Sequence, residues 1–292
     1  MHGPESVTNA IQFLLLPKNK FIGAIPEQCG NLQQLSRWNL DYNKYGKQGS
    51  YRYLSGALPD VIGRLRLLRE FRIHTHHLEG SLPDALGQLQ VLWNFVGSEG
   101  AFASSIPQQI AWLRGLIHLA VGTNRLQGML PSSVRFLQSL ELNLGISRNK
   151  LSGSLPEGLG GLRALKKFHG YANQLTGKVP SEIGQLQQLE VTFALYTNHL
   201  TGQIPGEIGR LHKLLECNLG NNNGLAGALP EAVSGLQALT VLSVRVTHVS
   251  GWPPEDSFGR LVCLTSLEGD RSQIRGALPD LIGRCAALRI IS

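Results

Sequence analysis

The sequence has 292 residues, of which 42% are hydrophobic and 16% are charged, and its formal net charge is +7 at pH 7. A hydrophobic share of this size is typical of a folded protein, and the sequence has no run of about eighteen apolar residues, which excludes a membrane-spanning helix within it. Its 27 Lys and Arg residues are scattered, so the charge does not indicate a basic nucleic-acid-binding tail.

The first apolar stretch lies at residues 11–16, and no basic segment precedes it. We therefore do not interpret the first twenty or so residues as a signal peptide. Ile11 and Leu14 instead match the first apolar positions of a repeat that continues to the last residues of the sequence.

That repeat is N-x-L-x-G-x-[ILV]-P-x-x-[ILV]-G-x-L. Its proline returns every 24 or 25 residues, with one interval of 33. The prolines concerned are Pro26, Pro59, Pro83, Pro107, Pro131, Pro156, Pro180, Pro205, Pro230, Pro254 and Pro279. A fixed period of this length predicts a solenoid of about eleven stacked coils.

Each coil can be interpreted from its pattern, for example Leu116, Leu119, Val121 and Asn124. The alternating L-x-L segment predicts a short strand with one buried side. The Asn should turn inward, where its amide can bond backbone groups left unpaired by the bend. The segment after the Pro, with apolar residues three apart, predicts a short helical turn on the other side of the coil.

The complete repeat, L-x-x-L-x-L-x-x-N-x-L-x-G-x-I-P-x-x-L-G, resembles that of plant-type leucine-rich-repeat proteins, such as the ectodomains of receptor-like kinases and receptor-like proteins. The resemblance covers residues 11–291 and implies one domain over 1–292, with repeats over about 11–292. It also implies a curved right-handed solenoid with parallel strands on the concave face and helical turns on the convex face. Family members usually carry cysteine-paired caps, and none is recognisable here.

Residues 44–53 are an insertion that explains the interval of 33, and we expect a loop pushed out of one coil. Its Lys44, Lys47 and Arg52 are interleaved with three tyrosines, a mixture that can bind nucleic acid by charge and stacking. A solvated loop or a protein contact is the favoured interpretation, and a nucleic-acid partner is not expected.

The segment HTHH at residues 74–77 has the composition of a metal site. In the repeat frame, however, His74 points outward and His76 points inward at the Asn position. Because alternation separates the two side chains and no cysteine falls nearby, we expect no metal there.

The inward asparagines should form a ladder through the stack, made of Asn19, Asn43, Asn124, Asn149, Asn173 and Asn198. Other residues stand at this position in four coils, namely His76, Gly100, Thr247 and Ser272, and these coils should pack less tightly. An extra residue at 221–223 leaves open which of three asparagines turns inward.

The outward strand positions of the middle coils carry small residues, which predicts a shallow floor. Beside it, Tyr171 and Tyr196 fall on neighbouring strands, with Arg148, Lys167 and His169 close by. Exposed aromatic residues next to basic groups are typical binding anchors, so these five residues form the candidate ligand- or partner-binding site. The alternative is a cross-strand tyrosine pair without a binding role.

Two glycine-rich segments, 158–161 and 221–227, lie within repeat units and lack the sequence context of a phosphate-binding loop. No nucleophile, base and orienting group come together in the repeat frame either. We therefore expect no catalytic residues, no enzyme activity and no cofactor.

The sequence thus predicts a recognition module that binds a protein or peptide through its concave or lateral surface. The alternative is an assembly subunit that contacts partners through its ends and loops. The apolar residues near both ends lead us to expect that further repeats or a partner cover them. Localisation stays open: the cell surface or extracellular space for a fragment of a receptor-like protein, otherwise the cell interior.

Overall fold

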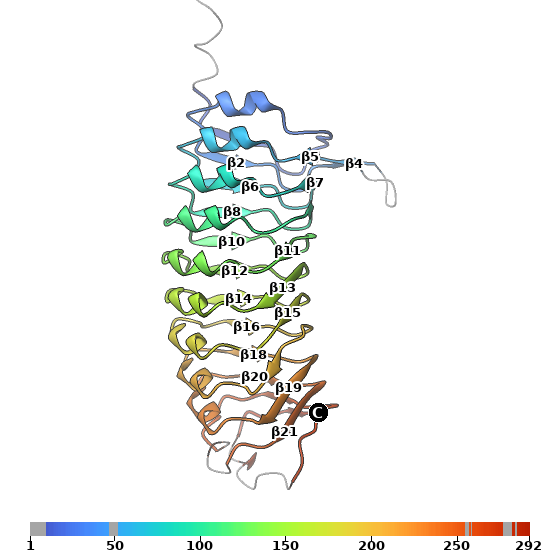
Figure 1. The fold of residues 1–292 in the computed structure, drawn as a ribbon, viewed down its shortest axis with the longest axis vertical. Coiled ribbons are helices and arrows are strands. Elements are labelled where there is room, and N and C mark those ends of the chain that lie inside the picture. Colours follow the sequence, from blue (N-terminus) through green and yellow to red (C-terminus); the bar gives the residue numbers. More distant parts are fainter. Residues whose placement is uncertain (1–9, 47–51, 255–256, 258, 277–281, 284) are drawn as a thin grey trace, which may run out of the picture.

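The computed structural model describes residues 10–46, 52–254, 257, 259–276, 282–283 and 285–292 as a stack of coils (Figure 1). Each coil contributes one strand to a parallel sheet of twelve strands. In chain order the strands are β1 (Phe13–Leu15), β2 (Arg37–Asn39), β6 (Glu70–Arg72), β8 (Asn94–Val96), β10 (His118–Ala120), β12 (Asn143–Gly145), β14 (Lys167–His169), β16 (Thr192–Ala194), β18 (Glu216–Asn218), β20 (Val241–Ser243), β22 (Ser266–Glu268) and β23 (Ile290–Ile291). The parallel solenoid predicted from the repeat is confirmed.

The register keeps equivalent residues of neighbouring coils side by side. The central residues Leu119, Leu144 and Phe168 are aligned across β10, β12 and β14, and all three are buried. Their flanking residues point to the opposite side because side chains alternate along a strand. We call this opposite, solvent-facing side of the twelve-stranded sheet, which is the predicted concave face, the sheet face.

The predicted helical turns are present as short 3-10 helices, which lie along one side of the stack (Figure 1). They are η3 (Glu27–Asn31), η4 (Asp60–Arg64), η5 (Asp84–Gln88), η6 (Gln108–Trp112), η7 (Ser132–Phe136), η8 (Glu157–Gly161), η9 (Ser181–Gln185), η10 (Gly206–Arg210) and η11 (Glu231–Gly235). Each follows directly on a repeat proline, whose ring fixes the entry dihedral, as at Pro180 with a φ of −71°. Within the described part of the chain, no helix has the length and apolar content needed to cross a membrane.

The repeat glycine after the apolar residue of this turn allows neighbouring turns to approach closely. A Cβ added to Gly184 would lie 2.7 Å from the carbonyl oxygen of Glu207 in the next coil. A side chain at this position would therefore push two coils apart, which explains why the motif places glycine there.

A second set of strands, not predicted from the sequence, follows the ladder positions on the other side of the stack (Figure 1). They form three small parallel sheets: β5 (Ser55–Ala57), β7 (His77–Gly80) and β9 (Ala101–Phe102); β11 (Gln127–Gly128), β13 (Lys150–Ser154) and β15 (Gln174–Thr176); β17 (Thr201–Gly202), β19 (Asn222–Ala228) and β21 (Thr247–Gly251). We call the surface that these strands form the lateral face.

The insertion at 44–53 leaves the stack through two paired arms where the sequence predicted only a loop. β3 (Lys44–Tyr45) pairs antiparallel with β4 (Arg52–Tyr53), and residues 47–51 lie outside the described part of the chain. The ring of Tyr53 stacks on His77 with a centroid distance of 4.0 Å, which ties the second arm to the next coil.

The ladder is seen most clearly at Asn149. Its amide nitrogen donates to the carbonyl oxygens of Val121 in the preceding coil and Ile146 in its own coil, at 3.1 and 3.0 Å. Its amide oxygen accepts from the backbone N–H of Leu126 at 3.0 Å. Equivalent bonds to a preceding coil are made by Asn43, Asn124, Asn173 and Asn198, and also by Asn222, the member of the 221–223 triplet that turns inward.

Asn19 does not belong to this ladder, which corrects the assignment made from the sequence. Its side chain is exposed and donates only to the carbonyl oxygen of Pro17 within its own turn. The physical reason is its place in the stack: β1 is the first strand of the described sheet, so no described coil precedes Asn19 to supply an acceptor.

Three coils that lack the ladder asparagine are tightly packed rather than loosened. His76 is 1% exposed, and its Nδ1 accepts from the backbone N–H of Leu78 at 2.9 Å. In the next coil, a Cβ added to Gly100 would lie 2.2 Å from Cε1 of His76, so the imidazole fills the space that Gly100 leaves. Thr247 is also buried, and its hydroxyl donates to the carbonyl oxygen of Val244 at 2.6 Å.

Candidate functional site

Two tyrosines stack on the sheet face. Tyr171 lies just beyond the end of β14 and Tyr196 just beyond the end of β16. Their ring centroids are 4.4 Å apart and their planes differ by 7°, and both side chains are partly exposed. The alternation of the repeat places both residues on the same side, and the register of neighbouring strands brings the rings into contact.

Arg148 and Ser147 both contact the side chain of Tyr171. The Arg148 guanidinium carbon lies 5.9 Å from the centroid of the Tyr171 ring. A hydrogen bond with Ser147 is the largest cause that lowers the pKa of the Tyr171 phenol, whereas burial is the largest cause that raises the pKa of Tyr196. The Tyr171 ring is thus held by contacts on two sides, which reduces the conformational entropy that it would lose on binding a partner.

His169 lies against the other side of Tyr171. Its ring meets the Tyr171 ring edge-on, with centroids 6.2 Å apart. Its Nδ1–H donates to Oδ1 of Asn143 at 3.0 Å. The structure therefore gathers Arg148, His169 and Tyr196 around Tyr171.

Lys167 occupies a different row of the sheet face, at the start of β14. The same row holds His118 at the start of β10 and Asn143 at the start of β12. Of this row, the sequence predicted only Lys167 as a site residue; His118 and Asn143 were missed because the outward residues of every coil were compared only at the two later positions. The first outward position, six residues before the ladder residue, is the signal that finds them.

The floor between these side chains is formed by small residues, as predicted. Ala120 and Gly145 are neighbours on β10 and β12, and Gly122 and Ser147 follow the same two strands. A Cβ added to Gly145 would lie 2.6 Å from Nδ2 of Asn143, so the amide of Asn143 folds over this glycine. This part of the sheet face is therefore lined by small side chains.

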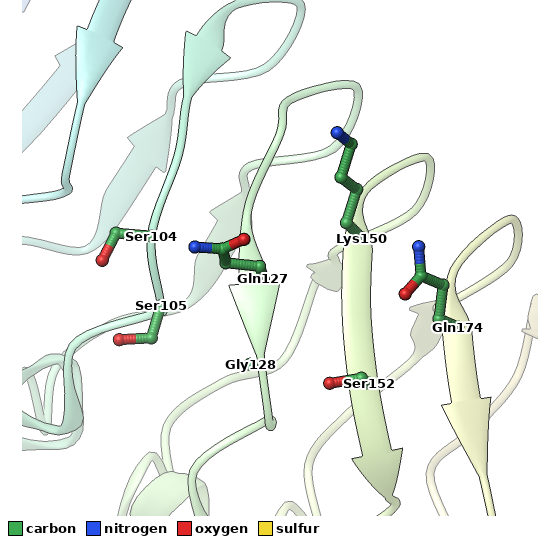
Figure 2. Close-up of a pocket in the computed structure, with 7 residues that line it drawn as sticks. All are labelled: Ser104, Ser105, Gln127, Gly128, Lys150, Ser152 and Gln174. Atoms are coloured by element: carbon green, nitrogen blue, oxygen red, sulfur yellow. The ribbon is translucent and has the colours of Figure 1, made fainter.

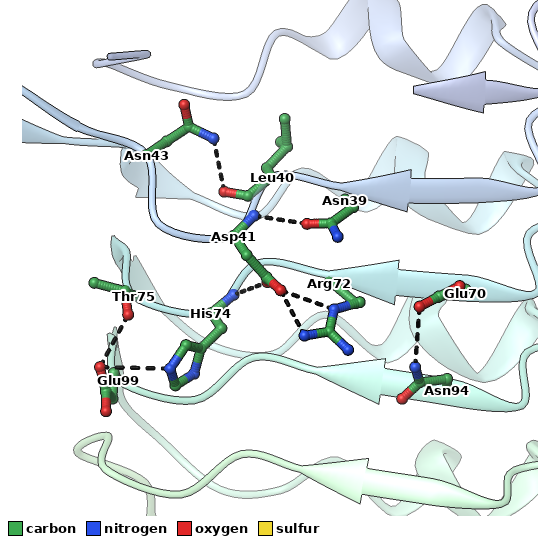
Figure 3. Close-up of polar contacts among 10 residues, drawn as sticks. All are labelled: Asn39, Leu40, Asp41, Asn43, Glu70, Arg72, His74, Thr75, Asn94 and Glu99. Carbon is green, nitrogen blue, oxygen red and sulfur yellow. Dashed lines mark hydrogen bonds and ion pairs between the residues drawn. The ribbon is translucent and has the colours of Figure 1, made fainter. Parts of the chain in front are cut away.

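Polar groups near the first coils are already paired with one another (Figure 3). The Asp41 carboxylate is buried and accepts from Nε and Nη2 of Arg72, at 2.8 and 2.7 Å, and from the backbone N–H of His74 at 2.7 Å. Nε2 of His74 lies 3.5 Å from the Glu99 carboxylate. This part of the sheet face is occupied by its own ion pairs, unlike the part around Lys167.

A polar groove of about 510 Å³ opens on the lateral face (Figure 2). Its lining residues are Ser104, Ser105, Gln127, Gly128, Lys150, Ser152 and Gln174. Ser104 stands at the repeat glycine position and adopts the left-handed conformation, with a φ of 64°. A serine in place of that glycine is the sequence signal that marks this coil as irregular.

Among the described residues, no three His, Cys, Asp or Glu side chains are arranged to hold a metal ion. The His74 and His76 side chains are separated as alternation requires, since one lies on the sheet face and the other in the interior.

A leucine-rich-repeat family model matches residues 136–162. The Arabidopsis receptor kinase HAESA, solved in complex with the peptide hormone IDA and a co-receptor, is 28% identical with a TM-score of 0.84, covering 97% of this chain and 45% of that one. The plant peptide hormone receptor RGFR1, in complex with RGF2, is 27% identical with a TM-score of 0.76, covering 99% of this chain and 48% of that one.

A TDR receptor structure is similar to the same degree, at 27% identity and a TM-score of 0.76, with 99% of this chain and 52% of that chain covered. The chain thus spans about half the length of each of these receptor chains. No curated protein sequence matches it.

Proposed function

Because the chain is a leucine-rich-repeat protein of the plant type, we propose that it is a non-enzymatic recognition module that binds a protein or peptide across its sheet face. The single observation that carries this proposal is the stacked, partly exposed pair of Tyr171 and Tyr196, with Arg148 beside it. Tyrosine and arginine are enriched among the residues that dominate binding energy, and a rigid aromatic pair loses little entropy when a partner covers it.

The similar structures support the proposal. HAESA and RGFR1 are described as complexes with a peptide hormone and with RGF2, respectively, and both resemble this chain over nearly its whole length. Since this chain spans about half of each receptor, the likeness concerns the kind of surface and not a particular hormone.

The test is affinity capture with the immobilised chain, followed by a binding measurement on the protein or peptide retained. Tyr171→Ala combined with Tyr196→Ala should weaken that binding at least about tenfold, the size expected for losing two central aromatic contacts. Phe136→Ala, which removes an exposed aromatic ring from η7, is the matched control and should leave binding unchanged. If the double variant keeps its melting curve and still binds as tightly as the wild type, the proposal fails.

An assembly subunit is the second candidate function, and apolar surface near the first coil favours it. Phe13 and Leu15 on β1 are 56% and 53% exposed. Next to them, Leu14, Leu16, Phe21, Ile22 and Trp38 line an apolar hollow of about 190 Å³. The same assay distinguishes the two functions. If Phe13→Gln combined with Leu15→Gln weakens capture while Tyr171→Ala combined with Tyr196→Ala does not, the result favours assembly through this end.

A further inference from the structure

Three neighbouring strands bring two histidines and a lysine together beside the tyrosine pair. Register pairs His118 of β10 with Asn143 of β12, and Gly145 of β12 with His169 of β14. Lys167 starts the same strand that His169 ends. All four polar side chains are partly exposed on the sheet face, so a bound molecule could reach them.

The amide of Asn143 orients both imidazole rings. Its Oδ1 accepts from Nδ1–H of His169 at 3.0 Å, and its Nδ2 lies 3.5 Å from Nε2 of His118. An amide nitrogen is only a donor, so the Nε2 of His118 that faces it is the acceptor. The neutral His169 then keeps an unprotonated Nε2, and the neutral His118 carries its proton on Nδ1.

The charged groups that act on these two rings, Arg72 and Lys167, are positive. Among the described residues, the Lys167 amino group forms no ion pair or hydrogen bond. The nearby Arg72 is engaged by Asp41, and the Glu70 carboxylate lies against Asn94 and Arg37, at 3.2 and 3.9 Å. The Glu70 carboxylate therefore already has partners, whereas Glu216 of β18, two strands from Lys167 in the same row, has no ion pair among the described residues.

Burial and the nearby positive charges lower the pKa values of the two histidines. Burial, then the charges of Arg72 and Lys167, lower the pKa of His118, and burial followed by the Lys167 charge lowers the pKa of His169. Both rings are consequently neutral near pH 7, and an added negative charge would oppose the causes that keep them so.

We propose that Lys167, His118 and His169 bind a side-chain carboxylate of an acidic peptide segment, which enters over the small floor residues Ala120 and Gly145. This inference rests on the proposed function, because it names the chemistry of a partner bound at the same face. A carboxylate fits better than a phosphate dianion, since only one group of the three carries a permanent charge at neutral pH.

The neutral His118 can donate its Nδ1–H to a bound carboxylate, and the carboxylate stabilises the protonated form of His169, whose Nε2 can take up a proton. Binding should therefore take up a proton and tighten as the pH falls. The charged groups that face His118 are Glu70 and Arg72 from β6 and Lys167 from β14. His169 is faced by Lys167 and by the ring of Tyr171. The neighbouring strands β12 and β16 contribute the uncharged residues Asn143, Gly145, Thr192 and Ala194, and Glu216 of β18 lies two strands from Lys167 in the same row.

The probe is the peptide Ac-Glu-Glu-Glu-Glu-NH2, compared with Ac-Gln-Gln-Gln-Gln-NH2 and with inorganic phosphate, in an NMR titration of the histidine ring signals. The glutamate peptide should shift the signals of His118 and His169, with a Kd at least about threefold lower at pH 5.5 than at pH 7.5. Lys167→Met should raise that Kd at least about fivefold. Lys178→Met, an exposed lysine of the lateral face, should not change it. His118→Gln with His169→Gln should remove the pH dependence, since glutamine keeps polar atoms but gains no charge.

Equal shifts with the glutamine peptide, no shift with the glutamate peptide, binding of phosphate alone, or equal losses in the two lysine variants would each overturn the inference. The capture assay separates this failure from that of the proposed function. If Tyr171→Ala with Tyr196→Ala weakens capture while Lys167→Met does not, the recognition surface stands and the acidic partner is wrong.

Discussion

A single side chain, Asn149, connects two coils through four hydrogen bonds. Besides its contacts with Val121, Ile146 and Leu126, its amide nitrogen donates to the carbonyl oxygen of Ser147 at 3.2 Å. The residue before it, Arg148, adopts the left-handed conformation with a φ of 53°, and so does the residue before most ladder positions. Such a conformation is unfavourable for residues other than glycine, so the ladder bonds must compensate for it.

Replacing Asn149 by alanine should therefore lower the free energy of unfolding by about 1–3 kcal/mol, because buried backbone groups lose their partners. Urea unfolding measures this. Asn19→Ala is the control: this side chain is exposed and bonds only within its own turn, so the change should stay within about 0.5 kcal/mol. Equal stability of the two variants would contradict the role of the ladder.

His76 makes the ladder sensitive to acid. Burial is the largest cause that lowers its pKa from 6.5 to about 4, and the charges of His74 and His77 add to it. Its Nδ1 is also the acceptor for the backbone N–H of Leu78, a role that a protonated ring cannot fill. The unfolded chain thus binds the proton more tightly than the native one, so stability that is present above pH 6.5 is lost as the pH falls from 6.5 to 4.

The wild type should lose on the order of 3 kcal/mol over this window relative to His76→Asn, which restores the repeat residue and cannot gain charge. Unfolding free energies measured at pH 7 and at pH 4 check the prediction. His199→Asn, at an exposed position, should retain the acid sensitivity of the wild type. A His76→Asn variant with unchanged pH dependence would show that His76 is not its source.

At the scale of the element, two coils each combine a phenylalanine at the first apolar strand position with a glycine at the second. Gly170 stands where the repeat has a second apolar residue, and Phe168 occupies the first apolar position of the same strand. A Cβ added to Gly170 would lie 3.1 Å from Cζ of Phe168 and 2.9 Å from Cδ2 of Leu195. The phenyl ring thus fills the volume that the glycine leaves, as it does at Phe95 and Gly97.

Gly170→Leu alone should destabilise the protein by about 1–3 kcal/mol through overpacking, and Phe168→Leu alone should leave a cavity. The double variant, which restores the repeat pattern, should cost at least about 1 kcal/mol less than the sum of the two. A double-mutant cycle by urea unfolding tests this. Additive effects would mean that the two positions do not share one volume.

The same examples show what the sequence could and could not predict. Alternation in L-x-L correctly predicted a parallel sheet, with about eleven coils expected where the described sheet has twelve strands, and the proline spacing predicted the positions of the described helical turns η3 to η11. The small lateral sheets were missed because their residues show no apolar alternation. The combination of Phe168 with Gly170 depends on side-chain volume in three dimensions, which a linear pattern does not encode.

For the candidate site, the pattern placed Tyr171 and Tyr196 on one face, and the structure brings their rings together. The contacts of Asn143 with His118 and His169 could not be predicted from the sequence. Several polar side chains are neighbours on this face, and only their directions in three dimensions decide which of them form hydrogen bonds. The lateral groove likewise involves Ser104. The sequence shows that a serine stands at the repeat glycine position, but it does not show that a groove forms there.

At the scale of the whole molecule, apolar side chains are exposed on the first and last strands of the described sheet. Phe13 and Leu15 on β1 are 56% and 53% exposed, and Ile290 and Ile291 on β23 are 54% and 51% exposed. An exposed apolar patch next to an unpaired strand edge promotes association.

The 292-residue chain on its own should therefore associate as its concentration rises, and appended capping repeats should reverse this. Light scattering measures the mass of the particles. Phe13→Gln with Leu15→Gln should reduce the association, whereas Trp112→Gln, which changes an exposed residue of η6, should not. A wild-type sample that stays monomeric at high concentration would contradict the prediction.

Hydroxyl-radical footprinting of the chain with its captured partner tests the central claim most directly, because it reports which aromatic side chains the partner covers. The sheet-face account predicts strong protection of Tyr171 and Tyr196, and unchanged oxidation of Trp112 and Phe136, which are 56% and 45% exposed on the helical side of the stack. Protection of Phe13 and Phe21 with both tyrosines still oxidised as in the free chain would contradict it and would assign the partner to the end of the solenoid.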